Sequence, residues 1–527
     1  MILHSIWYSA EKPTMTTLLK PLVNDVNQLC LQGVHVSTPD GVKLARGIIL
    51  QCSVDLPARA CVLQMKQFNG AHGCCYCEQK GETEPSNPMH RFWPYEASVT
   101  KRTHESLLSN AEEAVQTKSA EKGVKGYCAL YRHPPFNLGA GIVIDDLHCL
   151  YLGVVLSMLK YWFEKGNKGK PFYIGDKIEF CNKRLLGIKV PDIISRVPHT
   201  LHEFKHWKGS QLKAWLLYFA VPVLCGVLPA TFMNHFYLLV AAAHFLSSEM
   251  ITSRHIDLAE GFLTQFYMQM SALYGKKKCT MNFHMLSHFT ECVRNWGPLW
   301  AYSCFHFESM NGQLKSFFHG TRDMTQQAIF SFAMMQSLPS LAISSECPQM
   351  KALLEVLFDR KKQACHPTYT GLPTAVVGGN TLMLPSPTLQ AVCPEVRGNS
   401  RINVFYRLSL RNCLYYSKKY HRVKKRNSYT VKFLSTGGSV ALGQIDYFIL
   451  LDNSSLLAVV TKAIPNALMH EKLNGAIEAL DKVIVPVSFG PGVEVIPVLN
   501  ILCKCVCVDI LSTEKYIILF PNTVFGD

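Results

Sequence analysis

Residues 1–17, MILHSIWYSAEKPTMTT, contain neither the basic start nor the long apolar core that is typical of a secretory signal peptide. Disulfides accumulate mainly in secreted proteins, so we expect most of the 20 cysteines among these 527 residues to stay reduced. A Cys-x-x-Cys pair in such a chain is then a metal-binding or redox element rather than a disulfide staple.

The sequence also lacks an apolar run that is continuous enough to cross a membrane. Residues 214–233, AWLLYFAVPVLCGVLPATFM, carry no charge, but Pro222 and Pro229 divide them into shorter pieces. We therefore predict successive buried helices in this segment and no membrane partner. An internal repeat is absent as well.

Acidic residues are missing from one long segment near the C-terminus. Between Val396 and Ile445 there is no Asp or Glu, whereas 11 Lys or Arg occur, in a chain whose net charge is +15. The candidate nucleic-acid-binding residues are Lys418, Lys419, Arg422, Lys424, Lys425 and Arg426, and they interleave with Tyr415, Tyr416, Tyr420 and Tyr429. Cations beside aromatic rings are typical of a nucleic-acid surface. A solvated basic edge strand that resists aggregation is the alternative.

Apolar sequence is present in quantity, because 48% of the residues are hydrophobic, and the chain is too long for a single core. Residues 15–30 have helical spacing, and a hairpin with the turn Pro39-Asp40-Gly41 follows and runs up to Asp55. Helical patterns dominate residues 145–365. Pro and Gly in residues 366–400 predict a linker, and the short β runs beyond it predict a small sandwich or barrel.

The stretch GCCYC suggests a metal site. Cys74 and Cys77 have the spacing that lets two thiolates bind one tetrahedral Zn²⁺, and His90 and His104 could complete the set. Two alternatives stay open: buried cysteines without a metal, and a redox pair. His284 and His288 also share a helix face, but no HExxH-type base lies between them, so a metal there is the less favoured interpretation.

Three acidic positions are candidates for phosphodiester chemistry. Asp55 ends an apolar run, where a Mg²⁺ ligand could stand, or it simply leaves a strand into a Leu-Pro turn. Asp145 and His148 share one face of a helix start and could bind a metal or a phosphate; a simple N-cap with a packed His is the alternative. Glu308 lies among aromatic residues, and a buried carboxylate there would need a metal or partners such as Asn311 and Lys315.

Several of these stretches together resemble the CACTA (EnSpm-like) transposase family of animal genomes. The resemblance covers roughly residues 1–330. It rests on DLPARACVLQMKQFNGAHGCCYC, DDLHCLYLGV, FKHWKGSQLKAWLLYFAVPVLCGVLP and GPLWAYSCFHFESMNGQLKSFFHG, in that order. The C-terminal YYSKKYHRVKKRNSYTV and YIILFPNTV are similar to the tail domain of such elements.

The resemblance implies an RNase H-like domain whose DDE/D triad cuts and joins DNA with Mg²⁺. It places the second acid at Asp55, the third at Glu308 and an Asp-x-x-His signature at Asp145 and His148. The intervening helices correspond to the all-α insertion of this group and of hAT elements, and CCYC corresponds to a neighbouring zinc-binding element.

One departure from the family pattern limits the expected activity. The first triad Asp should lie on the first strand of the sheet, but this sequence starts at MILHSIWYS, which corresponds to the third strand. Asp25 does not replace it, because it lies within an amphipathic helix. A two-metal site that lacks one carboxylate should bind Mg²⁺ poorly.

The predicted fold is therefore α+β and multidomain, with a partial RNase H-like α/β domain interrupted by a large all-α insertion and followed by a small β-rich domain. The expected boundaries are 1–70 for the partial core, 71–110 for the zinc-binding segment, 111–365 for the helical insertion and the return to the core, 366–400 for the linker and 401–527 for the barrel-like domain.

The resulting hypothesis is a nuclear, transposase-derived DNA-binding protein that is catalytically impaired, with homo-oligomerisation left open. One alternative is an active Mg²⁺-dependent transposase whose N-terminus is missing from this sequence. A protein-interaction scaffold with the C-terminal domain as a reader module is the third.

Overall fold

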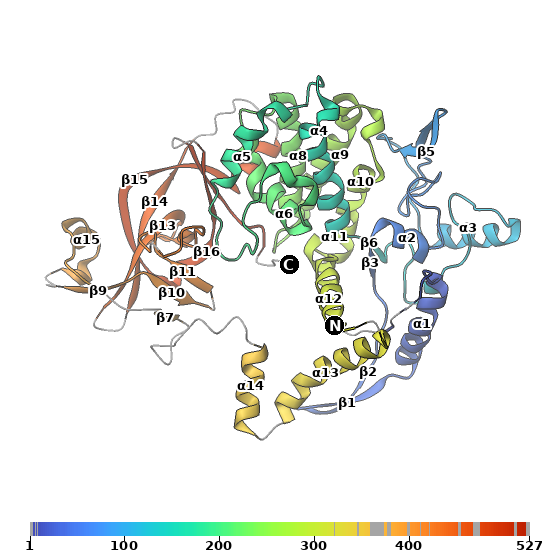
Figure 1. The fold of residues 1–527 in the computed structure, drawn as a ribbon, viewed down its shortest axis with the longest axis horizontal. Helices are drawn as coiled ribbons and strands as arrows, with labels where there is room; N and C mark the ends of the chain where they lie inside the picture. Colours follow the sequence, from blue (N-terminus) through green and yellow to red (C-terminus); the bar gives the residue numbers. More distant parts are fainter. Residues whose placement is uncertain are drawn as a thin grey trace.

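The computed structural model has three regions along the chain, which follow one another from blue to red in Figure 1. It describes residues 4, 5, 7, 9–320, 322–344, 347–358, 374–376, 381–397, 401–411, 413–420, 422–451, 455–466, 475–510 and 514–522. An N-terminal region of helices and short strands lies at one end, helices form the middle, and an antiparallel sheet lies at the other end. The chain is thus an α+β protein.

The N-terminal region contains the predicted helix and hairpin. Helix α1, Met15–Leu31, begins at Thr14, whose side chain accepts a hydrogen bond from Thr17 N. Strands β1 (Val34–Thr38) and β2 (Gly41–Ala45) pair antiparallel, and Gly41 has the positive φ of 109° that favours glycine. The helix and the turn of the hairpin are confirmed. The second strand of the hairpin was predicted to run up to Asp55, which is wrong: it ends at Ala45, and Cys52–Val54 forms a separate strand that does not pair with β1. The start of the chain, interpreted above as a third strand, lies largely outside the described residues.

A parallel strand pair follows. Strand β3, Cys52–Val54, leads into Asp55 and pairs with β6, Ile142–Ile144, which is fully buried. Between them lie α2 (Leu56–Val62), β4 (Glu82–Glu84), β5 (Asn87–Phe92), α3 (His104–Thr117) and the 3₁₀ turn Ala129–Arg132. This pair is the described part of the predicted α/β core, and its assignment to the RNase H-like folds remains a prediction.

The middle region is helical, as predicted. Its α-helices are α4 (Leu156–Phe163), α5 (Ile178–Leu186), α6 (Gly209–Ala214), α7 (Ala220–Leu224), α8 (Ala230–Leu246), α9 (Ser253–Tyr274), α10 (Met281–Met285), α11 (Phe289–Trp296), α12 (Phe305–Ser316), α13 (Met324–Ser344) and α14 (Pro348–Phe358). Two further segments, Leu147–Val155 and Trp215–Phe219, are π-helical, a conformation frequent at functional sites. Short 3₁₀ turns are Lys165–Asn167, Gly175–Lys177, Leu201–His206, Lys276–Lys278, Leu286–His288 and Leu299–Tyr302.

The charge-free run at residues 214–233 lies in the core of this region. Trp215 and Leu224 are fully buried, and Pro229 precedes the first turn of α8, where a proline is well tolerated. Among the described helices, none combines the length and the apolar character needed to traverse a bilayer. The prediction of successive buried helices is confirmed.

The C-terminal region is an antiparallel half-barrel. The strand order of its main sheet is β16-β12-β13-β14-β15-β18-β17, with β9 beside β13 and β8 beside β9, and a smaller sheet has the order β11-β10-β7. The strands are β7 (Thr374–Val376), β8 (Thr381–Met383), β9 (Ile402–Phe405), β10 (Arg407–Leu410), β11 (Cys413–Tyr416), β12 (Thr430–Leu434), β13 (Val440–Leu450), β14 (Leu456–Pro465), β15 (Ile484–Pro497), β16 (Ile501–Lys504), β17 (Val506–Ile510) and β18 (Glu514–Ile518).

The segment predicted as a linker contributes to this sheet. Strands β7 and β8, helix α15 (Pro387–Val392) and the 3₁₀ turn Pro394–Val396 all lie between residues 366 and 400. Strand β7 pairs with β10 and β8 pairs with β9. A linker is therefore wrong for residues 374–376 and 381–397, because Pro and Gly here separate short strands instead of domains.

The C-terminal sheet is attached to the helices. Val506 and Val508 of β17, together with Ile477 of α16 (Gly475–Leu480), belong to the same buried apolar cluster as the helical core. Residues 189–196, which we name the connecting strap, lie against the sheet: Val190 bridges to Arg426 and Lys189 to Cys507. The two regions therefore share buried apolar contacts and backbone bridges, and the sheet also has apolar clusters of its own, one of which contains Phe433 and Phe448.

Candidate functional site

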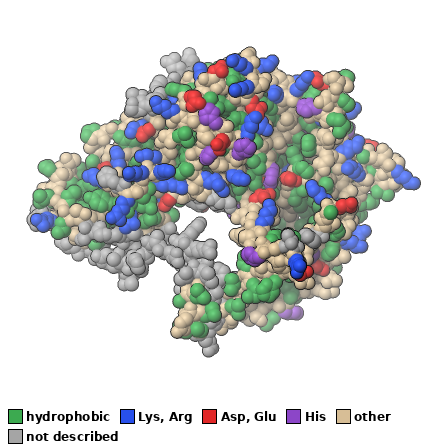
Figure 2. All heavy atoms as spheres, viewed as in Figure 1, with side chains coloured by type: hydrophobic (Ala, Val, Ile, Leu, Met, Phe, Trp, Pro, Cys, Tyr) green, Lys and Arg blue, Asp and Glu red, His purple; other side chains and the backbone are tan. Residues whose placement is uncertain are grey.

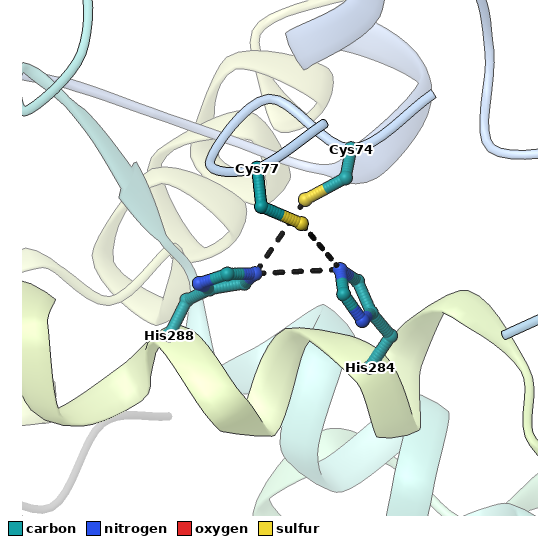
Figure 3. Close-up of side chains that lie close together, drawn as sticks. All are labelled: Cys74, Cys77, His284 and His288. Carbon is teal, nitrogen blue, oxygen red and sulfur yellow. Dashed lines mark hydrogen bonds between the residues drawn. The ribbon is translucent and has the colours of Figure 1, made fainter. Parts of the chain in front are cut away.

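Two cysteines and two histidines from distant parts of the chain form a buried cluster (Figure 3). Cys74 Sγ lies 3.6 Å from His288 Nε2, and Cys77 Sγ lies 3.3 Å from His284 Nε2. The two Nε2 atoms are 3.3 Å apart. Figure 3 shows the thiols of the loop above pointing toward the imidazoles of the helical segment below.

These distances fit a tetrahedral zinc site. With Zn–S near 2.3 Å and Zn–N near 2.0–2.1 Å, a tetrahedron has S···N edges of about 3.5 Å and N···N edges of about 3.3 Å. All four ligand atoms lie within 4.8 Å of one another, and all four residues are buried. A hydrogen bond from Cys74 lowers the pKa of the Cys77 thiol, which favours the thiolate that a metal requires. The group could therefore hold a zinc ion.

Neighbouring side chains hold the ligands in place. The Tyr267 hydroxyl donates to Trp93 O at 2.6 Å, so the 3.1 Å contact between that hydroxyl and His284 Nδ1 places the ring proton on Nδ1. The Nε2 atom of His284 is then free to bind a metal. The Arg102 guanidinium donates to Cys74 O and Cys77 O, each at 3.0 Å, and fixes the cysteine loop.

The predicted histidine ligands are wrong. His90 is exposed on β5, and His104 at the start of α3 accepts a hydrogen bond from Leu138 N at 3.1 Å. The cysteines pair instead with His284 and His288, whose i, i+4 spacing was visible in the sequence. Nothing local connected them to cysteines more than 200 residues away.

A second group lies where the parallel strands end. Val54 faces Ile144 in the β3–β6 register, so Asp55 and Asp145 both follow at the same sheet edge. Asp55 is the N-cap of α2 and accepts from Ala58 N at 2.8 Å. Asp55 therefore caps helix α2, as expected for a residue that leaves a strand into a helix. It also lies close enough to His148 to influence that ring.

Asp145 and His148 form a close pair. The buried Asp145 carboxylate accepts from His148 Nδ1 at 2.6 Å, and backbone N–H groups of His148 and Cys304 donate to it at 2.9 and 2.7 Å. Burial by itself would raise the pKa of Asp145, but these hydrogen bonds outweigh it and the pKa lies below its ordinary value. The hydrogen bond to Asp145, with the nearby Asp55 and Glu308 carboxylates, raises the pKa of His148. The capping interpretation of Asp145 is confirmed, because its carboxylate accepts from the backbone N–H groups of Leu147 and His148, and binding of a metal or a phosphate by this pair stays a prediction.

Glu308 lies on α12, and its carboxylate is 3.9 Å from His148 Nε2. Its side chain is 57% exposed, so the expectation of a buried acid is wrong. Of the aromatic residues around it in the sequence, Phe305 is buried and Phe307 is exposed. Its exposed carboxylate therefore does not need the partners proposed at Asn311 and Lys315.

A cleft of about 850 Å³ opens beside this group. Its lining includes His148 and Glu308, and also the cations of Arg196, Lys205 and Lys208. Sequence reasoning did not single out these three cations, because they are scattered through a segment of mixed composition.

The basic segment of the C-terminal region lies on β11 and the loop that follows it. Its exposed cations are Lys418, Lys419, Arg422, Lys424 and Lys425. Arg426 is half-buried and donates to the carbonyl oxygens of Pro191, Ile194 and Ser195 in the connecting strap. Its predicted role in nucleic-acid binding is therefore corrected to a structural one.

The tyrosines of this segment are largely engaged within the protein. Tyr415 is buried, and the rings of Tyr416 and Tyr420 stack on each other with centroids 5.5 Å apart. The Arg407 guanidinium lies 5.2 Å from the Tyr420 ring centroid. The segment consequently exposes its charged groups more than its aromatic rings.

In comparisons with known proteins, no family model and no curated protein matches this chain.

Proposed function

We propose that this chain is a transposase-derived protein that binds nucleic acid in the nucleus. The observation that supports it is the exposed basic segment from Lys418 to Lys425. None of its five exposed cations forms an ion pair with a carboxylate in the part of the chain that the structure describes. Unpaired surface cations bind a polyanion by releasing its condensed counterions.

The strand ends support the transposase origin. Asp55 and Asp145 follow adjacent parallel strands, and helix α12 brings Glu308 to the His148 side of the same edge. An RNase H-like core with a helical insertion would place its acids in this way. The resemblance in sequence calls for three triad acids, and Asp55 and Glu308 account for two. We therefore propose a protein that binds nucleic acid with impaired catalysis.

A second candidate function is Mg²⁺-dependent cleavage of phosphodiesters. One observation favours it: the carboxylates of Asp55 and Glu308 both lie near the His148 ring beside an open cleft. Mg²⁺ commonly binds one or two carboxylates together with substrate phosphates, so these residues fit it. Bound Mg²⁺ would supply charge stabilisation at a phosphate. Asp145 would hold the His148 ring in a fixed orientation toward the cleft.

Binding measurements with matched variants test the proposed function. Lys418→Gln, Lys424→Gln and Lys425→Gln are combined in one variant; Lys20→Gln, Lys118→Gln and Lys125→Gln, at exposed positions of the N-terminal region, form the control. Fluorescence anisotropy with labelled DNA at several salt concentrations gives Kd and its salt dependence. The first variant should bind more weakly with a shallower salt slope, and the control should match the wild type. Equal behaviour of both variants, or a wild type that binds no nucleic acid, would refute the proposal.

A further inference from the structure

We infer that the cationic wall of the cleft, Arg196, Lys205 and Lys208, is a binding site for the backbone phosphates of a nucleic-acid strand. This inference rests on the proposed function and adds a site to it. It differs from the basic segment of the C-terminal sheet, because these three cations line the same cleft as Glu308 and His148.

The local fold explains why these side chains face outward. Leu201 and Phe204 of the 3₁₀ turn are buried, and so is Trp207, whose Nε1 donates to Thr200 O at 3.2 Å. These three anchors hold the backbone against the helical core. The residues between and after them, including Lys205 and Lys208, are left exposed. The backbone of the wall is therefore anchored by buried side chains, and its cations are exposed to solvent.

The charge balance of the wall favours an anionic ligand. Lys205 pairs with Glu164 at 2.8 Å, but both groups are partly exposed, and such surface pairs contribute little and exchange readily. Arg196 and Lys208 form no ion pair with any carboxylate that the structure describes. Among the residues that the structure describes, Glu308 is the single acidic residue that lines the cleft. Three cations against one carboxylate leave the lining of the cleft with a net positive charge, which attracts a phosphate.

The connecting strap joins the wall to the basic segment of the sheet. Arg196 directly follows Ile194 and Ser195, whose carbonyl oxygens accept hydrogen bonds from Arg426. Asp192 of the strap accepts from Ser428 Oγ at 2.9 Å and pairs with the buried Lys504. Figure 2 shows Lys and Arg side chains on the face of the C-terminal sheet and on the adjoining helical region. One nucleic-acid molecule can therefore contact both cationic surfaces.

Three variants test the cleft wall. Arg196→Gln, Lys205→Gln and Lys208→Gln are combined to remove the charge, and Arg196→Lys, Lys205→Arg and Lys208→Arg are combined to retain it. The Lys20, Lys118 and Lys125 variant described above is the control for net charge. Each protein is titrated with labelled DNA at several salt concentrations, and also with a mononucleotide as competitor.

The charge-removing variant should lower the slope of log K against log salt by about two to three, since each lost phosphate contact removes about 0.9. The charge-retaining variant should bind like the wild type. A slope equal to that of the control would overturn the inference while the proposed function stands. Full competition by the mononucleotide would also overturn it, because the cleft would then be a nucleotide pocket. A wild type that binds no DNA would instead remove the proposed function.

Discussion

Asp55 and Asp145 directly follow Val54 and Ile144, which face each other in the parallel pair β3–β6. Parallel strands end at a common edge, so the two carboxylates lie at one place although a large part of the N-terminal region separates them in sequence. The His148 ring, bonded to Asp145 and influenced by Asp55 and Glu308, stands among them. A ligand bound at these carboxylates would therefore also lie beside the His148 ring.

Zinc content tests the Cys₂His₂ cluster. We expect one zinc per wild-type chain by elemental analysis, and loss of it in Cys77→Ser and in His288→Ala, because each removes one of four ligands. Removal of the metal should lower the thermal unfolding midpoint, since a structural zinc contributes to folding free energy.

His90→Ala and His104→Ala are the matched controls for this prediction. Both change a histidine that lies outside the cluster, and His90 is exposed. Both should keep the full zinc content. Loss of zinc in His90→Ala, with retention in His288→Ala, would restore the ligand set expected from the sequence spacing.

Mg²⁺ binding tests the acidic group. Asp55→Asn and Glu308→Gln should each weaken Mg²⁺ binding about tenfold or more in calorimetry of the DNA complex, because each removes a carboxylate oxygen that Mg²⁺ prefers. Glu203→Gln, an exposed acid outside the cleft lining, is the control. If the wild type cleaves DNA, both variants should lose the cleavage. Unchanged Mg²⁺ affinity in Asp55→Asn would exclude this residue from the site.

Acid should destabilise the protein through two buried histidines. Burial lowers the pKa of His235 and of His244 to about 4, whereas an unfolded chain takes up these protons near pH 6.5. Between these values the unfolded state binds more protons, so the free energy of unfolding falls as the pH falls. Each histidine should remove about 3 kcal/mol by pH 4.

Urea unfolding at pH 7 and at pH 5 measures this effect. His244→Gln keeps an N–H that can reach Leu217 O, the partner of His244 Nε2 at 2.9 Å. Its stability should therefore depend less on pH than that of the wild type. The exposed His90→Gln should show the wild-type dependence. If the stability of His244→Gln depended on pH as strongly as that of the wild type, His244 would not be a source of the acid sensitivity.

Arg426 and Arg422 should behave differently despite their proximity in sequence. Arg426→Ala removes hydrogen bonds to three carbonyls of the connecting strap and should lower the free energy of unfolding by about 2–3 kcal/mol. Arg422 is exposed, so Arg422→Ala should change stability by less than about 0.5 kcal/mol and lower the DNA salt slope by about one. Unfolding measurements and anisotropy titrations of both variants test this difference. The reverse pattern would show that Arg426 contacts the DNA.

Local patterns predicted the parts of the fold that short-range physics specifies. Helix α1, the β1–β2 hairpin, the helical middle region and the C-terminal strands follow from apolar periodicity and turn residues. The cysteine half of the cluster was predictable for the same reason, because its spacing is local. Its histidine half depends on a contact across more than 200 residues, which no local pattern contains.

Side-chain exposure was harder to predict than secondary structure. Aromatic neighbours in the sequence suggested a buried Glu308, but helix α12 is largely solvated and the carboxylate is exposed. Arg426 looked like its basic neighbours and instead contacts the strap. In both cases the outcome depends on which face another part of the chain covers.

The Cys₂His₂ cluster also affects which insertions and deletions this chain could tolerate. It ties the loop after Asp55 to the segment before Glu308 across a sequence separation of 207 residues. Closing a loop of this length costs about 5 kcal/mol of chain entropy, and a metal held at its base would keep it closed. Insertions or deletions in exposed turns of this loop would then leave the four ligands of the cluster together. The loop as a whole cannot be exchanged, because it also contributes β6 and Asp145 to the strand edge beside Asp55.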